Sequence, residues 1–398
     1  MPPTKRARAA GTKSTPRPAN ATHPPVTPKP RILSGVQPSG KLHLGNYFGA
    51  IQQHIQMQDE GEAFYFIADY HALTTLEEAA EKRVLAEFAR QYTAIVSGKG
   101  PQTDMSHTDS HARRETLKAH VHDVALDYLA LGLDPAKATF YRQSDVPEVC
   151  ELAWMLSTLT GMGLLERAHS FKDKTARGIS SSVGLFTYPI LMAADILIVQ
   201  SHLVPVGKDQ VQHLEMTRDM AGYFNQAYGE LFPMPQERLG VAAVVPGTDG
   251  QKMSKSYGNT IDIFAEGKPL EKKVMGIVTD STPVDAPKNP DACNVVALYK
   301  LFATEDELAK VVDMYKNPLL DAESRGGRPF GYGDAKKLLL AKINVYFEPA
   351  RKRRKELERD PGFVEEVLQA GAKRARQVAQ TTMRLARQMV GMAPQPVG

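Results

Sequence analysis

The sequence predicts an α/β protein with a doubly wound parallel, Rossmann-like nucleotide-binding sheet, followed by an all-helical domain. The apolar residues Ile32 and Leu33 lead into a loop rich in Gly and Pro and then into an amphipathic run, the pattern of a strand, a tight turn and a helix. Strand-like and helical stretches then alternate, as they do in doubly wound sheets. From 263 to 392 the pattern is mostly helical, so we expect one domain over 31–262 and another over 263–392.

Length and composition are those of a folded protein with room for two domains: 398 residues, 42% of them apolar and 24% charged. Lys and Arg exceed Asp and Glu by 49 to 45, a mild balance that permits an RNA partner without requiring one. The two distant cysteines, Cys150 and Cys293, exclude a disulfide scaffold and a zinc site and favour the reducing cytoplasm. The most apolar segment, 188–199, is too short to span a bilayer, so we expect no membrane association.

The two ends of the chain are predicted to be tails. Residues 1–30 hold eight prolines, six Lys or Arg and no acidic residue, a composition that buries too little apolar surface to fold. The proline density also argues against the amphipathic helix of an organelle transit peptide. Weak attraction to RNA phosphates and a dispensable tail are equally good interpretations. Residues 393–398 form a second, short tail.

The loop that starts at Gly35 is the predicted nucleotide-binding element. Backbone amides at a helix N-terminus carry partial positive charge and hold phosphate, and glycines let the ligand approach the backbone. The spacing from Gly35 to Lys41 matches a P-loop, but Leu42 stands where a Ser or Thr would ligate magnesium. Pro38 also removes one N–H from any cradle of amides. A P-loop is therefore disfavoured.

Two short motifs, at 43–46 and 252–256, occur together in the chain and resemble the two signatures of class I aminoacyl-tRNA synthetases. His43-Leu44-Gly45-Asn46 fits the pattern H-x-G-N, which places His43 and Asn46 on one helical turn facing the same phosphates. Lys252-Met253-Ser254-Lys255-Ser256 is the pattern KMSKS, preceded by a strand-like run at 241–245. Its two ammonium groups can close over a triphosphate and follow charge onto the leaving pyrophosphate. Either motif alone is weak evidence, whereas the pair is strong.

Further candidate contacts follow predicted strands, where ligands of parallel sheets bind. A buried strand over 63–67 is followed by His71, and helices are expected over 76–96 and 114–131 before a strand at 138–143. A later strand–turn–helix unit follows at 204–220. There Gly207 turns the chain and Asp209 is expected to be the N-cap of the helix.

Asp195 lies in the apolar run 185–197, where an ionised carboxylate needs a donor or a positive charge. Backbone amides or an arginine would satisfy it. It would also accept the N–H of an indole, which is a donor-only group. A tyrosine hydroxyl could donate to the same carboxylate, so the residues alone leave tryptophan and tyrosine open as substrates.

Over about residues 32 to 392 the chain resembles the tryptophanyl-tRNA synthetases. The resemblance rests on the run from Gly35 to Ala50, on KMSKS and on the segment around Asp195. It implies that tryptophan reacts with ATP and Mg²⁺ to give tryptophanyl-adenylate and pyrophosphate, and that the tryptophanyl group then passes to the 3′ end of tRNA(Trp). It also implies a homodimer without a bound organic cofactor or structural metal.

The resemblance assigns roles to individual residues. Those expected in catalysis are His43, Asn46, Lys174, Lys252 and Lys255. Those expected to bind ATP are Gln37, Pro38, Ser39, Gly45, Asn46, Gly207, Lys208, Asp209, Lys252, Met253, Ser254, Lys255 and Ser256. Those expected to bind tryptophan are His71, Tyr188, Met192, Asp195 and Gln210. Lys174 belongs to the polar segment 166–182, which the resemblance makes a lid.

The helical domain carries two basic groups that are expected to include tRNA-contacting residues. One is the cluster Arg351–Lys355. The other is the outer face of the last helix, with Lys373, Arg374, Arg376, Arg384 and Arg387. In the resembled family this domain binds the tRNA anticodon.

Three alternatives remain open. A tyrosine-specific relative would differ only in the chemistry of its pocket. A small-molecule nucleotidyltransferase shares the fold and an H-x-G-H loop but has no need of a basic helical domain. A non-catalytic RNA-binding paralogue should have lost catalytic-loop residues, whereas this chain keeps His43, Asn46, Lys252 and Lys255.

Overall fold

A five-stranded parallel sheet forms the centre of the molecule. The computed structural model describes residues 29–75, 108–168, 182–240 and 244–392. The strands are β1 (Arg31–Val36), β2 (Glu62–Ile67), β3 (Ala138–Arg142), β4 (Leu203–Val206) and β5 (Gln236–Leu239). Their order is β3-β2-β1-β4-β5, all parallel, so the chain builds one half outward from β1 and then crosses to the other side. The predicted doubly wound sheet is confirmed, and its switch point lies between β1 and β4.

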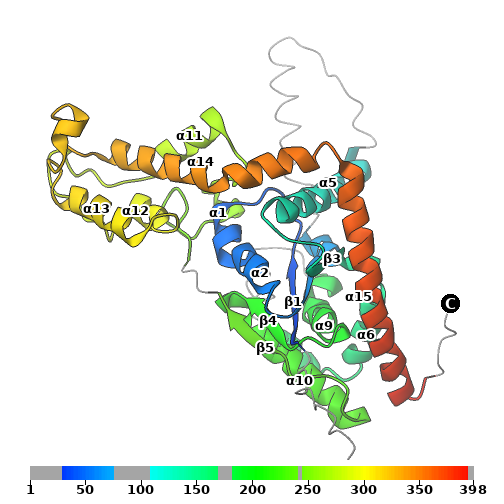
Figure 1. Cartoon of the computed structure of the whole chain (residues 1–398). Helices are drawn as coiled ribbons and strands as arrows, with labels where there is room; N and C mark the ends of the chain where they lie inside the picture. The colour runs from blue at the N-terminus through cyan, green and yellow to red at the C-terminus, as the bar shows by residue number, and fades with distance from the viewer. Residues whose placement is uncertain (1–28, 76–107, 169–181, 241–243, 393–398) are drawn as a thin grey trace, which may run out of the picture.

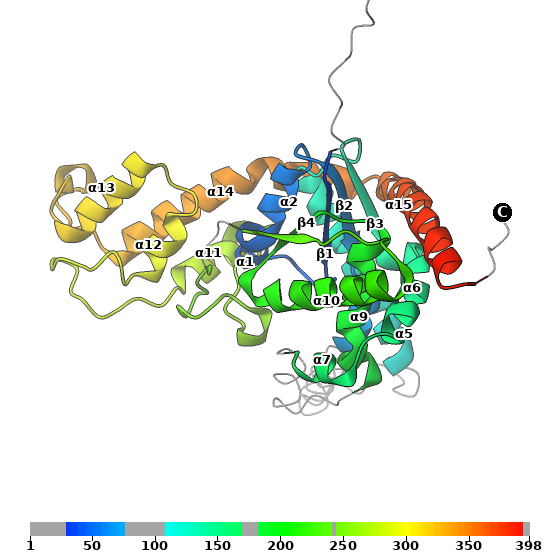
Figure 2. The ribbon, with the colours of Figure 1, turned by 90° about the horizontal axis from the view of Figure 1, so that it is seen from below.

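Both faces of the sheet are buried, which explains the nearly continuous apolar sequence of its inner strands. Along β2, Ala63, Tyr65 and Ile67 belong to the core on one face, and Phe64 and Phe66 belong to the core on the other. Helices cover both faces (Figures 1 and 2). The described α-helices before residue 263 are α1 (Leu44–Asn46), α2 (Gln52–Met57), α3 (Asp69–Ala72), α5 (Thr108–Ala130), α6 (Glu148–Ser157), α7 (Met162–Glu166), α9 (Val183–Ile198) and α10 (Val211–Tyr228).

Close packing fixes one glycine of the first loop. Gly35 of β1 is paired in register with Phe66 of β2. A Cβ atom added to Gly35 would lie 2.5 Å from the Phe66 ring, so no larger residue fits without moving the ring. The start of the predicted nucleotide loop is therefore set by the packing of the sheet beneath it.

The segment after residue 262 is helical, as predicted. It contains α11 (Gly267–Met275), α12 (Asn294–Tyr299), α13 (Glu305–Lys316), α14 (Tyr332–Leu357) and α15 (Pro361–Met389). The first four helices extend away from the sheet, whereas α15 returns along its edge beside β3 and α6 (Figure 1). At the crossing with β3, a Cβ added to Gly371 would lie 1.8 Å from the Phe140 carbonyl oxygen. The last helix thus packs with the sheet.

Some predicted elements differ from the structure or lie outside the described residues. Val244 and Val245, of the strand-like run at 241–245, are not in a strand. The Val245 carbonyl accepts the Met253 N–H instead, and this bond joins the segment to the KMSKS loop. The helix expected over 76–96 lies outside the described residues, as do residues 1–28 and 393–398 of the tails. No helix in the described part of the chain is long and apolar enough to cross a membrane.

Candidate active site

The loop after β1 brings His43 and Asn46 together at the start of α1. His43 is the N-cap residue, and its Nδ1 accepts the backbone N–H of Asn46 at 3.3 Å. In return, the Asn46 side-chain oxygen accepts the backbone N–H of His43 at 3.1 Å. This reciprocal capping box fixes both side chains. Burial, together with the charge of Lys255, lowers the pKa of His43 to about 4. Near pH 7 the ring is therefore neutral, and because Nδ1 accepts, its Nε2–H is the free donor.

The KMSKS loop lies directly against this first loop. The Lys255 ammonium donates to the carbonyl oxygens of Ser39 and Gly40 at 3.1 and 2.9 Å. The buried Met253 accepts the Gly45 N–H through its sulfur at 3.4 Å. Desolvation lowers the pKa of Lys255 to about 8, against the opposing charge of Asp262. Two motifs about 200 residues apart in sequence thus form one site.

A buried asparagine that the sequence analysis missed holds the shape of the KMSKS loop. The Asn259 oxygen accepts the Ser254 N–H at 2.8 Å, and its NH2 group donates to the Lys252 carbonyl at 3.2 Å and to Asp249 at 2.8 Å. Asn259 follows the motif closely in sequence, which is the only signal that could have found it. The Lys252 side chain is exposed beside this network.

A cavity of about 470 Å³ opens at the carboxyl ends of β1 and β4, at the switch point of the sheet. All five residues expected to bind tryptophan line it: His71, Tyr188, Met192, Asp195 and Gln210. Gln37 and Gly207, which were expected to bind ATP, line it as well. The cavity therefore brings the predicted tryptophan contacts together with two of the predicted ATP contacts, whereas the H-x-G-N and KMSKS motifs are not among its lining residues.

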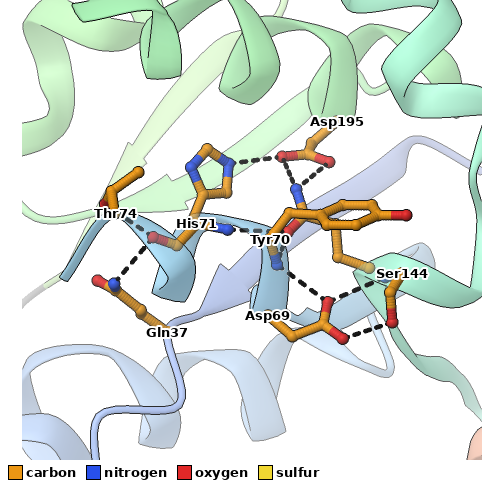
Figure 3. A network of polar contacts seen from close by, with 8 residues as sticks. Gln37, Asp69, Tyr70, His71, Thr74, Ser144 and Asp195 are labelled. Carbon is orange, nitrogen blue, oxygen red and sulfur yellow. Dashed lines mark hydrogen bonds and ion pairs between the residues drawn. The ribbon is translucent and has the colours of Figure 1, made fainter. Parts of the chain in front are cut away.

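Asp195 is the polar centre of the cavity wall, and Figure 3 shows its contacts. Its side chain is only 3% exposed on α9. Oδ2 accepts from His71 Nε2 at 2.9 Å, and both carboxylate oxygens accept from Gln143 Nε2, at 2.9 and 2.8 Å. Burial raises the pKa of Asp195, and the bonds from His71 and Gln143 act in the opposite direction. Its donors are thus a histidine and a glutamine, rather than the arginine or backbone amides considered from sequence.

Surrounding bonds hold the other cavity residues in place. The His71 carbonyl accepts from Gln37 Nε2 at 3.2 Å and from the Thr74 hydroxyl at 2.9 Å (Figure 3). The Tyr188 hydroxyl is hydrogen-bonded to Nε2 of the buried His213. The sequence analysis named neither Thr74 nor His213. Both lie within three or four residues of a predicted contact, on the same helical turn.

The prediction that Asp209 caps the helix after β4 is wrong. Lys208–Gln210 form a turn of 3-10 helix, and α10 begins after it with Gln210 as its N-cap residue and no side-chain cap. The additional turn places Asp209 one residue too early, and its carboxylate accepts from Gln210 Nε2 at 3.1 Å instead. Lys208 and Asp209 are exposed beside the cavity. Lys174 lies outside the described residues.

The basic cluster at 351–355 is not a uniform solvent face. Arg351 is buried, and its Nε donates to the Ile263 carbonyl at 3.0 Å. Arg354 forms ion pairs with Asp123 and Asp127 of α5. These two arginines therefore dock α14 onto the rest of the protein, and the expectation that some residues of the cluster contact tRNA stays a prediction.

The outer face of α15 is used in a similar way. Arg376 pairs with Glu148 and Arg387 pairs with Glu151, both on α6, while Arg374 donates to the Pro135 carbonyl. These three side chains bind the protein itself, although Arg374 and Arg376 are exposed as expected and only Arg387 is half-buried. Among the predicted residues, the exposed Lys352, Lys373 and Arg384 remain candidates for contact with a polyanion.

The fold and these joined motifs define a class I aminoacyl-tRNA synthetase. The family described as tRNA synthetases class I (W and Y) matches residues 26–104 and 100–347, and the chain belongs to this family. A tryptophan–tRNA ligase of Fusobacterium nucleatum is 50% identical over 364 residues, covering 91% of this chain and 98% of the relative. One from Rhodopirellula baltica is 48% identical, covering 91% of this chain and 99% of the relative.

A solved structure has the same overall fold. It is that of a Campylobacter jejuni tryptophanyl-tRNA synthetase complexed with ADP and tryptophan, 44% identical to this chain with a TM-score of 0.75. The match covers 91% of this chain and all of the solved one. The similarity thus extends through both the sheet and the helical part.

Proposed function

We propose that this chain is a tryptophan–tRNA ligase. The observation that carries the proposal is the contact between the H-x-G-N and KMSKS motifs beside a cavity whose wall holds the buried Asp195. The identity of 44 to 50% to tryptophan–tRNA ligases, over most of each chain, supports the same conclusion. The ADP and tryptophan of the related crystal structure are chemically suited to the two halves of this site.

On this proposal, the indole N–H of tryptophan donates to Asp195, and Tyr188 and Met192 contact the ring. Gln210 approaches the amino acid's polar groups. The cavity thereby aims the tryptophan carboxylate at the α-phosphate of ATP. The carboxylate oxygen forms the new bond to phosphorus as pyrophosphate leaves, so no covalent enzyme nucleophile is needed.

The two motifs supply donors and charge to the phosphates. His43 presents a neutral Nε2–H beside Asn46, and the helix N-terminus adds its partial positive charge. The triphosphate competes with the Ser39 and Gly40 carbonyls for the Lys255 ammonium, which then follows charge onto the leaving pyrophosphate. Lys174 and Lys252 complete the set of cations. Mg²⁺ enters with ATP as part of the substrate, since it retains phosphate oxygens and water as ligands.

In the second step, the terminal ribose hydroxyl of tRNA(Trp) attacks the adenylate carbonyl and AMP leaves. We assign tRNA binding to the helical segment at 263–392, whose helices α11 to α14 extend away from the sheet (Figure 1). The exposed Lys352, Lys373 and Arg384 offer phosphate contacts. We place the reaction in the cytoplasm, in keeping with the two unpaired cysteines.

The test is ATP–pyrophosphate exchange without tRNA, measured separately with tryptophan, tyrosine and phenylalanine. Exchange with tryptophan alone is expected. Exchange with tyrosine would retain the mechanism and overturn the substrate. If folded protein catalyses no pyrophosphate exchange with any of the three amino acids in the presence of Mg²⁺, the result contradicts the proposed enzymatic function and favours an RNA-binding paralogue.

A further inference from the structure

Gln143 links the strand β3 to the cavity and is almost completely buried, with 1% of its surface exposed. It lies directly after β3, in the turn Gln143–Asp145. Its Nε2 donates to both oxygens of Asp195, at 2.9 and 2.8 Å. Its Oε1 accepts the backbone N–H groups of Tyr70 and His71, at 3.1 and 3.4 Å. One side chain therefore joins β3, α3 and α9 beneath the cavity.

These bonds leave a single orientation for the amide. Backbone N–H groups only donate, so Oε1 must face Tyr70 and His71, and the NH2 group must face Asp195. Asp195 is consequently an acceptor toward Gln143. Oδ2 also accepts from His71, so it receives two donors, whereas Oδ1 receives only the bond from Gln143. The larger free acceptor capacity is at Oδ1.

We propose that Gln143 is a positioning residue that holds Asp195 as an acceptor-only carboxylate and thereby gives the cavity its preference for a ring N–H donor. The inference rests on the proposed function, since that N–H belongs to the indole of tryptophan. Gln143 acts through Asp195 and does not line the cavity itself. Its role is to keep the Oδ1 lone pairs unprotonated and directed at the substrate.

The surroundings of Asp195 explain why such a residue is needed. Asp69 of α3 acts on it as a like charge and favours its protonated form, whereas His71 favours the ionised form. Tyr141 of β3 and Cys150 of α6 also interact electrostatically with Asp195. In their neutral forms they supply no positive charge that would stabilise its carboxylate. Burial of Asp195 in an apolar core also favours its protonated form. Without the Gln143 amide, proton uptake by Asp195 becomes more favourable and the carboxyl group is free to rotate.

The first test is Gln143→Leu, which keeps the volume but removes all four bonds. The probes are tryptophan and 3-benzothienylalanine, an analogue that carries sulfur in place of the ring N–H. Lost positioning should raise KM for tryptophan in pyrophosphate exchange about 10- to 100-fold, because the hydrogen bond to a charged acceptor is impaired. The inhibition constant of the analogue should change less than about 3-fold, since it makes no such bond. KM for ATP should be unchanged.

Gln58→Leu is the matched control. Gln58 is also buried and bridges backbone groups, donating to the Gly132 carbonyl at 3.3 Å and accepting the Asp134 N–H at 2.9 Å. It has no contact with Asp195 in the described structure. Its loss should leave the ratio between the tryptophan KM and the analogue's inhibition constant at the wild-type value.

Gln143→Glu keeps the test decisive if the leucine variant does not fold. One oxygen of the new carboxyl group can still accept from Tyr70 and His71, but the other can donate to Asp195 only when it is protonated. Preference for tryptophan over the analogue should therefore be present at low pH and decline as pH rises. Wild-type protein should not lose its preference in this direction, because an amide does not titrate.

Two results would overturn the inference and leave Gln143 a purely structural residue. One is that Gln143→Leu weakens the binding of tryptophan and of the analogue equally. The other is that the preference of Gln143→Glu for tryptophan over the analogue does not depend on pH. Failure of the proposed function gives a different result. In that case wild-type protein shows no exchange with tryptophan, and the inference falls with the function on which it rests.

Discussion

His43 and Lys255 illustrate how single side chains acquire their chemistry from their surroundings. Burial keeps His43 neutral, and the capping bond to Nδ1 leaves its Nε2–H free to donate. Desolvation against the Ser39–Gly40 carbonyls lowers the pKa of Lys255 to about 8. A neutral donor and a cation with a lowered pKa are therefore placed side by side in the protein without substrate, an arrangement that would reduce reorganisation in the proposed reaction.

We predict that kcat/KM for ATP falls as pH rises through about 8, because kcat/KM reports groups of the free enzyme and only the charged form of Lys255 attracts triphosphate. The direction of the pH dependence follows from this pKa: Lys255 is protonated and charged well below pH 8 and loses its positive charge above it. Lys255→Arg should remove this limb, since a guanidinium remains charged. The measurement is pyrophosphate exchange between pH 6 and pH 10. Lys252→Arg is the control and should keep the fall in kcat/KM above pH 8. If Lys255→Arg also keeps that fall, the titrating group is not Lys255.

At the scale of elements, the last helix is attached to the sheet by close contact and by ion pairs. Gly371 lets α15 approach the backbone of β3, and Arg376 and Arg387 pair with glutamates of α6. The element that carries Gln143 and the turn below the cavity is thus supported by the end of the chain. A change that disrupts this contact should therefore affect the cavity through β3.

Gly371→Ala should destabilise the protein by at least about 2 kcal/mol, because the new methyl group overlaps the Phe140 carbonyl and must push α15 away. Urea unfolding measures this change. Gly362→Ala, in the first turn of the same helix, is the matched control, since its Cβ meets nothing closer than the Asp360 carboxylate at 3.5 Å. The control should be neutral or stabilising by up to about 1 kcal/mol. Equal effects at both positions would show that α15 does not pack as described.

A second prediction concerns the contact between α14 and α5. Arg354→Met leaves the carboxylate of Asp127, which is 2% exposed, without its cation, so the free energy of unfolding should fall by about 3 kcal/mol. Adding Asp127→Asn removes the unpaired negative charge and should restore part of the lost free energy of unfolding. Arg353→Met is the control, because Arg353 pairs with the exposed Glu356 and should change stability by less than about 1 kcal/mol. Additive losses in the double variant would rule out the buried pair.

At the scale of the whole molecule, large apolar side chains are exposed on α6, α7 and α9, helices that pack against one another. Trp154 on α6 is 69% exposed, and Met162 and Val183 at the starts of α7 and α9 are also exposed. Exposed large apolar side chains are typical of protein–protein interfaces. The homodimer implied by the family resemblance is a proposal that these exposed side chains support.

Trp154→Glu should convert a dimer into monomers, because a carboxylate would be buried without a partner at the interface. Sedimentation equilibrium measures the change. Trp154 is also the only tryptophan of the chain, so its fluorescence in wild-type protein should shift to longer wavelength on dilution below the dissociation constant. Val345→Glu, at an equally exposed position on α14, should leave the mass unchanged. Wild-type protein that sediments as a monomer at micromolar concentration would refute the homodimer.

Local patterns were sufficient to predict much of the fold and many of the residues near the site. The strands at 63–67 and 138–142 follow from short apolar runs with turn residues at their ends, and His71 and Asp195 stand out as polar groups beside such runs. The start of α10 could not be predicted in the same way, since Asp209 satisfies every local rule for an N-cap residue. An additional 3-10 turn over Lys208–Gln210 shifted the start of the helix by one residue.

The sequence by itself determined the parallel α/β sheet, the helical segment after residue 262 and the two motifs proposed to hold phosphate, because each depends on residues that are neighbours along the chain. Tertiary structure alone decided the partners: Gln143 with Asp195, Arg354 with Asp127, and Gly371 with Phe140. Charge and polarity are properties of a residue, but pairing is a property of position. A basic helix face has the same sequence pattern whether it meets RNA or the protein's own carboxylates, and only the packing of distant elements distinguishes the two.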